Sequence, residues 1–375
     1  MIDFAVVGIG RMGSIHSSNL ANGLVEGARL VAVCDIDKAK LQEFKVKYPE
    51  VLTFDNHITM LRECKIDAVL VATPHYSHVQ IVTDTLNSGV NVLSEKPQSV
   101  TIGEAGKANI IAQSHPDLLY GIIYNQRTNP VYVRAKEIIT SGALGGIRRV
   151  TMIITDWYRS QFYYDQGDWR ASWSGEGGGL LINQCVHQLD ILQWLTGMPK
   201  TINAVCKTVN RNITVENDVT AVFEYENGAS GTFVASGHEL YGTNRLEIAG
   251  DNGKIVIDNM ELTFIKYDES EFEVNSKVTE GYGETGASIE RLKYEGDWRE
   301  RDEKYGQQLR VVEAFTEVLL GKRTAPIAYG KEGINALSII NGIYLSAYAG
   351  KKVSLPLDAK EYDSLLDNLV KGESK

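Results

Sequence analysis

A glutamate and a lysine stand directly before a proline in the segment NVLSEKPQS, residues 91–99, where an apolar run ends. Such a pair is most often an incidental ion pair in a solvated loop. A lysine amine held in a cleft, however, can stabilise a developing negative charge or exchange a proton with a reacting oxygen. Glu95 and Lys96 are therefore candidates for chemistry, and the surrounding sequence decides between the two interpretations.

A glycine-rich turn near the N-terminus is the second chemical signal. Gly8, Gly10 and Gly13 fit G-x-G-x-x-G, with Arg11 and Met12 between them, after the apolar run DFAVV and before the helical pattern SIHSSNL. The first glycine permits a tight turn, the second lets a pyrophosphate approach the backbone, and the third lets the helix pack closely on the strand. The pattern alone is weak, but the flanking strand and helix indicate a dinucleotide-binding turn.

Asp35 lies 22 residues beyond Gly13, at the end of the second apolar run. This is the spacing expected for an acid that binds the ribose of a dinucleotide. Its carboxylate can accept hydrogen bonds from the ribose hydroxyls but would repel a 2′-phosphate by roughly 4 kcal/mol at 4 Å and an effective dielectric near 20. NAD is therefore favoured over NADP, although Lys38 and Lys40 are close enough in sequence to offset part of this preference.

Elements that can position these residues are visible up to about residue 124. Short apolar runs alternate with helical patterns: DFAVVGI, RLVAVCD, DAVLVAT, NVLSEK and LLYGIIY. This order predicts a doubly wound parallel sheet, in which ligands bind beyond the carboxyl ends of the strands. The segments ATPHYSH (72–78) and SEKPQS follow the fourth and fifth strands, so Lys96 is expected near the nicotinamide end of a cofactor crevice. The other expected cofactor-binding residues here are Thr73, Pro74, His75, His78, Glu95 and Gln126.

The pattern changes after about residue 125. Alternating segments with turn signals at Asn227-Gly228 and Asn252-Gly253 indicate an antiparallel sheet with one face packed on helices. Amphipathic stretches near 303–320 and 331–348 are expected to pack against these layers. We therefore predict an α/β chain with a Rossmann domain at 1–124, and at 125–375 an α+β domain on an open, mainly antiparallel sheet.

A helix is predicted after the glycine run at 177–179. Asn183, His187 and Asp190 recur at i, i+4 and i+7 on one face. Such a stripe is usually the solvated side of a helix. Here it is uncharged apart from Asp190 and is followed by Trp194, which favours a sheltered face and a binding role. The opposite, apolar face comprises Leu181, Cys185, Leu189 and Leu192.

The intervening segment DWYRSQFYYDQGDWRASW, residues 156–173, is rich in aromatic and charged residues. It could be a loop packed for stability or a sugar-binding platform, in which aromatic faces contact the apolar side of a pyranose. The candidates for binding sugar hydroxyls are Arg159, Tyr163, Tyr164 and Asp165. His238 could face the same cleft, or equally be a structural histidine.

These segments together resemble the Gfo/Idh/MocA oxidoreductases, which include inositol dehydrogenases and glucose-fructose oxidoreductase. The matching segments are the glycine turn with Asp35, ATPHYSH, Glu95-Lys96-Pro97, YNQRTNPVY (124–132) and GEGGGLLINQCVHQLDILQWLTG (175–197). The resemblance implies a second domain whose exposed sheet face builds dimers or tetramers. It also implies a helix that presents an Asp-x-x-x-His pair to the substrate beside the lysine, and it places Trp169 and Arg170 close to the cofactor.

The sequence departs from the family pattern at Asn183, where the family has the aspartate of that pair. An amide can position a substrate hydroxyl but cannot accept its proton, so acid-base work falls on Lys96 and His187. His187 is the better base by intrinsic pKa, with Lys96 stabilising the developing oxyanion, but the two roles could be exchanged. The asparagine also leans away from a typical inositol dehydrogenase.

Composition limits the remaining function classes. The net charge of −10 and a pI near 5.3 argue against a nucleic-acid partner. The four cysteines have no metal-binding spacing, and no run of about 18 apolar residues exists, so neither a metal site nor a membrane span is expected. We expect a cytoplasmic, NAD-dependent enzyme that oxidises a secondary hydroxyl of a pyranose sugar or glycoside. The resemblance implies that this hydroxyl is the one on C3. The alternatives are an inositol or polyol 2-dehydrogenase, a redox glycosidase using NAD, and a non-catalytic NAD or sugar sensor.

Overall fold

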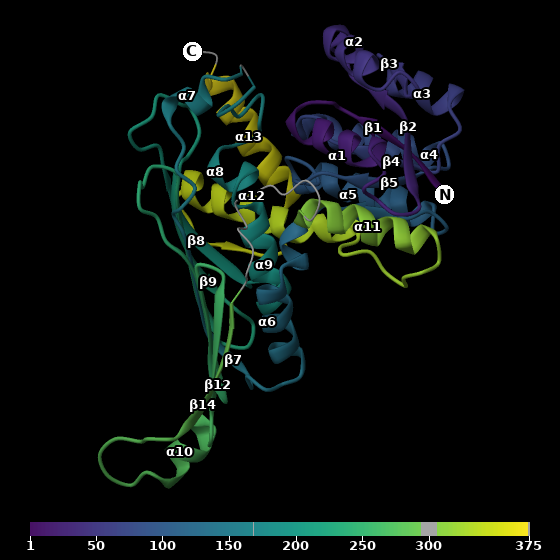
Figure 1. Ribbon diagram of the computed structural model, residues 1–375. Coiled ribbons are helices and arrows are strands. Elements are labelled where there is room, and N and C mark those ends of the chain that lie inside the picture. Colours follow the sequence, from purple (N-terminus) through teal and green to yellow (C-terminus); the bar gives the residue numbers. More distant parts are fainter. Residues whose placement is uncertain (168, 294–305, 374–375) are drawn as a thin grey trace. The chain divides into compact units, whose positions relative to one another are not determined.

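A computed structural model of the chain describes residues 1–167, 169–293 and 306–373. The chain divides into two compact units, Met1–Thr128 with Trp298–Leu337, and Asn129–Asp297 with Ser338–Lys375 (Figure 1). The sequence did not predict that a late segment returns to the first unit. The functional boundary expected between residues 124 and 125 stays a prediction.

The first unit contains the predicted doubly wound sheet. Six parallel strands lie in the order β3-β2-β1-β4-β5-β6. Strands β1 and β4 are almost wholly buried, as expected when helices cover both faces of a parallel sheet. The strands are β1 (Ile2–Val7), β2 (Ala28–Cys34), β3 (Leu52–Phe54), β4 (Ala68–Val71), β5 (Asn91–Ser94) and β6 (Tyr120–Ile122).

The helices of this unit begin at recognisable caps. Asp37 accepts hydrogen bonds from the amides of Ala39 and Lys40 at the start of α2, and Thr101 caps α5 in the same way. The helices are α1 (Arg11–Ala21), α2 (Lys38–Lys47), α3 (His57–Glu63), α4 (His78–Asn87), α5 (Ile102–Ser114) and α11 (Gln307–Leu319), with short 3₁₀ turns η1 (His75–Ser77), η2 (Asn125–Thr128) and η3 (Gly330–Glu332).

Helix α11 is the expected amphipathic stretch near 303–320, of which residues 303–305 lie outside the described residues. It packs Phe315 against Phe4 of β1, with the ring centroids 6.3 Å apart. The amphipathic pattern is therefore present, but the prediction that this stretch packs against the antiparallel sheet and its helices is wrong, because its apolar face packs on the parallel sheet.

The second unit is built on a nine-stranded sheet in the order β14-β13-β12-β11-β7-β10-β9-β8-β15. Only the β7–β10 pairing is parallel, which confirms the prediction of a mainly antiparallel sheet. The strands are β7 (Ile147–Ile154), β8 (Thr201–Lys207), β9 (Asp218–Glu224), β10 (Ser230–Ser236), β11 (Asn244–Gly250), β12 (Gly253–Asp258), β13 (Glu261–Tyr267), β14 (Ala287–Lys293) and β15 (Val353–Ser354).

The predicted hairpin turns are present, one of them shifted. Asn227-Gly228 lies in the loop between β9 and β10. In the second hairpin Gly253 already pairs with Gly250, so the turn residues are Asp251 and Asn252 rather than Asn252 and Gly253. A two-residue loop between paired strands explains the shift.

Helices cover one face of this sheet. Figure 1 shows α6 and α9 lying along it, and residues of β9 alternate between buried and exposed, as expected for a sheet packed on one side. The helices are α6 (Pro130–Thr140), α7 (Gln161–Tyr164), α8 (Leu180–Asn183), α9 (Val186–Thr196), α10 (Glu271–Lys277), α12 (Gly333–Ala349) and α13 (Ala359–Glu373), and α12 belongs partly to each unit. Among the described residues, no helix is long and apolar enough to cross a membrane.

Candidate active site

The glycine turn leaves space for a ligand at one of its three glycines. A Cβ at Gly8, whose φ is +86°, would lie 2.7 Å from the carbonyl oxygen of Ala72, and a Cβ at Gly13 would overlap the carbonyl group of Gly8. A Cβ at Gly10 would meet no atom within 4 Å. The outer glycines are thus required by packing, whereas the space before Gly10 is open, as a bound pyrophosphate requires. Arg11 and Met12 begin α1 directly after it.

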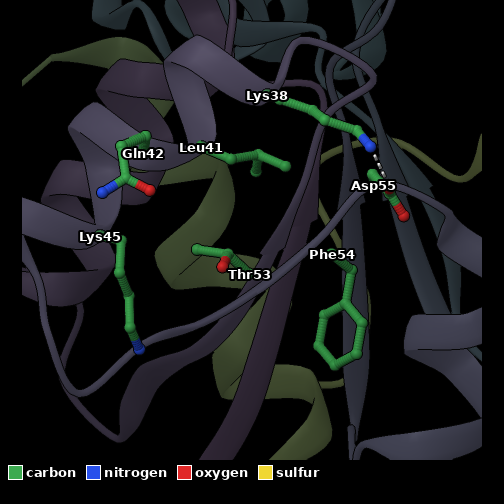
Figure 2. A pocket seen from close by; sticks show the side chains of 7 residues that line it. All are labelled: Lys38, Leu41, Gln42, Lys45, Thr53, Phe54 and Asp55. Atoms are coloured by element: carbon green, nitrogen blue, oxygen red, sulfur yellow. Dashed lines mark ion pairs between the residues drawn. The ribbon is translucent and has the colours of Figure 1, made fainter.

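Asp35 is fixed beside this turn. Its Oδ2 accepts a hydrogen bond from the amide of Ile9 at 2.8 Å, and its Oδ1 accepts one from the amide of Asp37 at 2.9 Å. The two nearby lysines pair with other acids: Lys38 Nζ lies 3.3 Å from Asp55 (Figure 2), and Lys40 Nζ lies 3.6 Å from Asp37. Both pairs are exposed and weak, but they direct the amines to other carboxylates.

A surface pocket between α2 and β3 lies close to this region. Figure 2 shows its lining side chains, which include Leu41 and Phe54 together with Lys45. The amine of Lys45 donates hydrogen bonds to the carbonyl oxygens of Pro49 and Val51. None of the residues predicted for the site lines this pocket.

His78 joins the two loops that follow β4 and β5. Its Nδ1 lies 2.7 Å from the carbonyl oxygen of Pro97, and its Nε2 lies 2.7 Å from that of Thr73. Burial lowers the pKa of His78, while the two carbonyl contacts oppose this shift. The peptide bond Lys96-Pro97 is cis, and Pro74 precedes η1, in which His75 is buried. The segments ATPHYSH and SEKPQS thus form one connected structure at the carboxyl end of the sheet.

Glu95 has a buried partner that the sequence analysis missed. Its Oε1 lies 2.9 Å from Nε2 of His16, and its Oε2 accepts a hydrogen bond from the amide of Lys96 at 3.3 Å. His16 is 1% exposed, and it belongs to α1, three residues after Gly13. The helix that follows the glycine turn therefore also fixes the glutamate beside Lys96.

The last predicted cofactor residue of this unit, Gln126, is half-buried in η2, directly after β6. Its neighbour Arg127 forms an ion pair with Glu332, with Nη1 and Oε2 2.6 Å apart. This pair ties the 3₁₀ turn to η3, so the backbone at Gln126 is held at the carboxyl end of the sheet.

In the second unit, Asn183 and His187 do not lie on one regular helix. The amides of Gln184 and Cys185 both bond to the carbonyl oxygen of Leu180, at 3.0 and 2.9 Å. The second bond spans five residues, a π-type turn that separates α8 from α9. The prediction of one continuous helix, which was based on the i, i+4 spacing, is therefore wrong.

The stripe that carries these residues is sheltered, as predicted. Asn183 and His187 are half-buried, and Asp190 is fully buried and accepts a hydrogen bond from Gln193 at 3.0 Å. It is therefore not the solvated side of a helix.

Asn183 contacts a buried carboxylate. Its amide nitrogen donates a hydrogen bond to Oε1 of Glu176, which is 3% exposed. The other carboxylate oxygen accepts a bond from the amide of Ala171 at 2.8 Å, and Nη1 of Arg170 lies 3.9 Å from Oε1. Because a carboxylate only accepts hydrogen bonds, the amide must turn its nitrogen toward Glu176. Glu176 was not predicted, although it lies in the glycine-rich segment.

Tyr163 organises the aromatic segment. Its ring packs against two guanidinium groups, with the ring centroid 4.8 Å from the Cζ of Arg159 and 5.0 Å from that of Arg170. Its hydroxyl accepts hydrogen bonds from Arg170 at 3.1 Å and from Gln184 at 3.0 Å. Arg170 also lies over the ring of Trp169, at 4.5 Å. Four predicted residues of the segment are thus brought together.

Three other predicted residues lie around this group. Tyr164 is buried, which raises its pKa, whereas Asp165 is exposed and accepts a bond from Gln161 at 2.9 Å. His238 Nε2 lies 2.9 Å from Oδ2 of Asp218. Among the described residues, no group of three or more His, Cys, Asp or Glu side chains could hold a metal ion.

Two family models match this chain. Residues 2–121 match the oxidoreductase family with an NAD-binding Rossmann fold, and residues 132–256 match the GFO/IDH/MocA C-terminal domain. The chain therefore belongs to the Gfo/Idh/MocA family of oxidoreductases. It is an NAD-dependent oxidoreductase, which confirms the predicted family, cofactor and enzyme class.

Curated relatives agree with this assignment, and solved structures share the fold. The chain is 26% identical over 279 residues to scyllo-inositol 2-dehydrogenase (NAD(+)) of Bacillus subtilis, covering 72% of this chain and 78% of that protein. It is 32% identical over 197 residues to the rhizopine catabolism protein MocA of Rhizobium meliloti, and the match covers 52% of this chain and 57% of that protein.

The fold matches that of the WlbA dehydrogenase of Bordetella pertussis, solved with NADH and UDP-GlcNAcA, with a TM-score of 0.77 and 24% identity. The match covers 95% of this chain and 99% of that chain. Levoglucosan dehydrogenase with NADH gives a TM-score of 0.76, 20% identity and 95% and 100% coverage.

Proposed function

We propose that the protein oxidises a secondary hydroxyl of a pyranose sugar or glycoside, with C3 as the expected position. The observation that carries this proposal is the fixed backbone around Lys96, where Glu95 is bound by His16 and the carbonyl of Pro97 by His78. A lysine so placed, in a unit that binds NAD, is expected to act on a reacting oxygen rather than on solvent. Residues 1–124 would bind the cofactor, and residues 125–375 the substrate.

The glycine turn and Asp35 would hold NAD, which would supply the acceptor for the hydride of the carbinol carbon. His187 takes the hydroxyl proton, because an imidazole is a base near neutral pH whereas an unperturbed lysine is protonated there. Lys96 donates a hydrogen bond to the same oxygen and stabilises its developing negative charge. Asn183, held by Glu176, orients the substrate hydroxyl.

The group around Tyr163 would hold the sugar ring. Trp169 is 36% exposed, so its ring is accessible for contact with an apolar sugar face. Arg159 and Arg170, stacked on Tyr163, present guanidinium donors to hydroxyls, and Asp165 and His238 extend the set of candidates.

The experiment is an absorbance assay at 340 nm with NAD and a panel of sugars, glycosides and inositols. Lys96→Ala and His187→Ala should each lower kcat by roughly 100-fold or more. The loss of kcat in the double variant should be smaller than the product of the two single losses, because both residues act on one oxygen. NAD binding measured by calorimetry should survive His187→Ala. His115→Ala, on a half-buried histidine bonded to Asn87, is the matched control. Full activity of either variant would remove that residue from the mechanism.

The same panel distinguishes the alternatives. Oxidation of inositols alone would favour a polyol 2-dehydrogenase, the activity named for the relative from Bacillus subtilis. Glycoside cleavage without net NADH would indicate a redox glycosidase, and no reaction with retained NAD binding would indicate a sensor.

We also infer a homo-oligomer, a dimer or tetramer, built through the uncovered face of the nine-stranded sheet. Val205 and Val222 lie on this face and are 53% and 46% exposed. Apolar side chains on an exposed sheet face are typical of an interface between subunits. The cytoplasmic location stays a prediction.

A further inference from the structure

Glu216 lies between β8 and β9 and is 1% exposed. Its Oε2 accepts a hydrogen bond from the amide of Gly179 at 3.0 Å, and its Oε1 accepts one from the amide of Leu181 at 2.8 Å. Its own backbone carbonyl accepts the amide of Leu180 at 3.1 Å. One residue therefore binds three consecutive amides at the start of α8, which have no partner within the helix.

A tyrosine completes the arrangement. The hydroxyl of Tyr344, from α12, donates to Oε1 of Glu216 at 3.0 Å, and its ring packs edge-on against Trp173, with the centroids 5.0 Å apart. A Cβ at Gly178 would overlap this hydroxyl, and one at Gly179 would overlap the carbonyl of Glu216. The glycine run thus lets the backbone reach the carboxylate.

The segment that Glu216 fixes leads directly into the proposed site. Asn183 ends α8, and His187 follows the π-type turn as the second residue of α9. We propose that Glu216 is a positioning residue for the reaction, whose buried carboxylate fixes the start of α8 and thereby holds Asn183 and His187 for the substrate. The proposal rests on the dehydrogenase function proposed above.

The charge of this carboxyl changes near neutral pH. Burial raises the pKa of Glu216 to about 7, against the opposing effect of its hydrogen bonds. Burial also raises the pKa of five titratable neighbours on which its charge acts, so these stay neutral: Tyr164, Cys185, Cys206, Tyr344 and Tyr348. The charged groups acting on the same neighbours are Arg159, Arg211, Asp156 and Asp218. Because the folded site favours the protonated carboxyl over the buried carboxylate, the segment is held less firmly as pH rises through 7.

The test compares Glu216→Gln with the unaltered protein at pH 6 and pH 8.5. Amide hydrogen exchange of the 177–187 segment reports the positioning, and kcat/KM reports its effect on the reaction. At pH 6 the variant should exchange about tenfold faster and lose about tenfold in kcat/KM, because its side-chain nitrogen cannot accept the bond that one carboxyl oxygen accepts from a backbone amide. At pH 8.5, where the buried charge weakens the native segment, both differences should fall below about threefold.

Two further variants make the result decisive. Tyr344→Phe keeps the carboxyl but removes one donor to it, together with a hydroxyl that accepts from the amide of Gly179 at 3.3 Å. It should give a smaller effect, about threefold at pH 6, and it carries the test if Glu216→Gln fails to fold. Glu226→Gln, on an exposed glutamate paired with Lys200, should change nothing. Unchanged exchange at pH 6, or a difference that is equal at both pH values or larger at pH 8.5, would overturn the proposal. If no substrate is oxidised, the exchange measurement still decides on Glu216, and only the dehydrogenase function fails.

Discussion

At the scale of single residues, Asn183, which the resemblance predicts to replace an aspartate of the family, contacts a buried carboxylate. Asn183 donates to Glu176, so an acid is present beside the site although not at the expected position. In Asn183→Asp, two carboxyl groups would meet, and one would have to keep a proton. An added ionised carboxylate alone would raise the pKa of His187. In this variant the rise should be small, because Glu176 forces one of the two carboxyl groups to stay neutral.

Exchanging the two groups tests this pairing. Asn183→Asp should lower kcat/KM by about tenfold or more, since a donor bonded to a buried carboxylate is replaced by a second acceptor. The double variant Asn183→Asp with Glu176→Gln restores one donor and one acceptor and should recover most of the loss. Steady-state kinetics of the three variants, including Glu176→Gln alone, measure this. A double variant no better than Asn183→Asp would show that the pairing does not matter.

Cofactor preference depends on a single carboxylate. Asp35 is fixed beside the glycine turn, and Lys38 and Lys40 pair with other acids. The kcat/KM with NAD should therefore exceed the kcat/KM with NADP by at least about tenfold. Asp35→Ser should narrow this ratio severalfold, whereas Lys38→Ala, the control, should leave it unchanged. Equal use of both cofactors by the unaltered protein would contradict this role of Asp35.

Residue-scale prediction depends on local signals. The glycine turn and Glu95-Lys96-Pro97 are contiguous motifs, so their types and spacing were sufficient to name them as candidates. His16 was missed because its partner Glu95 is 79 residues away, and a histidine in an amphipathic helix has no pattern of its own. Glu176 was missed because its neighbour Asn183 meets it only after the glycine run folds back.

At the scale of elements, the break between α8 and α9 shows the limit of periodicity. Leu181 and Cys185 are both fully buried, as the apolar pattern predicted, even though one wider turn separates them. A single π-type turn shifts the register by one residue, and such a small shift leaves the apolar positions buried. The amides that Glu216 binds could not be predicted, since its place in the β8–β9 connection depends on the folded sheet.

This carboxyl also makes stability depend on pH. The folded pKa of Glu216, about 7, lies above its usual value of 4.5, so the folded chain holds this proton more tightly than the unfolded chain. The resulting stabilisation is fully present below about pH 4.5 and is lost as pH rises through 7, by at most about 3 kcal/mol.

Chemical unfolding of the native protein and Glu216→Gln at pH 5 and pH 8 measures this effect. The native protein should lose stability relative to the variant between the two pH values, while other titrating groups cancel in the comparison. Parallel pH dependence of the two proteins would contradict the raised pKa.

At the scale of the whole molecule, the two kinds of sheet were predictable because each has its own period. Continuous apolar runs indicated strands buried on both faces, and alternation indicated strands covered on one face. The pattern of α11 predicted an apolar face, but the expected partner, the antiparallel layers, was wrong, because amphipathicity does not specify which sheet a helix covers. Its packing of Phe315 on Phe4 had to come from the structure.

The uncovered face of the nine-stranded sheet leads to the prediction about assembly. Asn203 pairs with Val222 and Val205 with Thr220 across β8 and β9, so the two valines are neighbours on that face. A stable interface buries about 800 Å² on each partner and excludes unpaired charge from its centre. The double variant Val205→Asp with Val222→Asp should therefore dissociate the oligomer to monomers in sedimentation velocity at micromolar concentration. Ile110→Asp, on a residue of α5 that is 65% exposed, should leave the assembly intact. A native protein that sediments as a monomer would show that there is no oligomer. An aspartate variant that stays assembled would place the subunit contact on another surface.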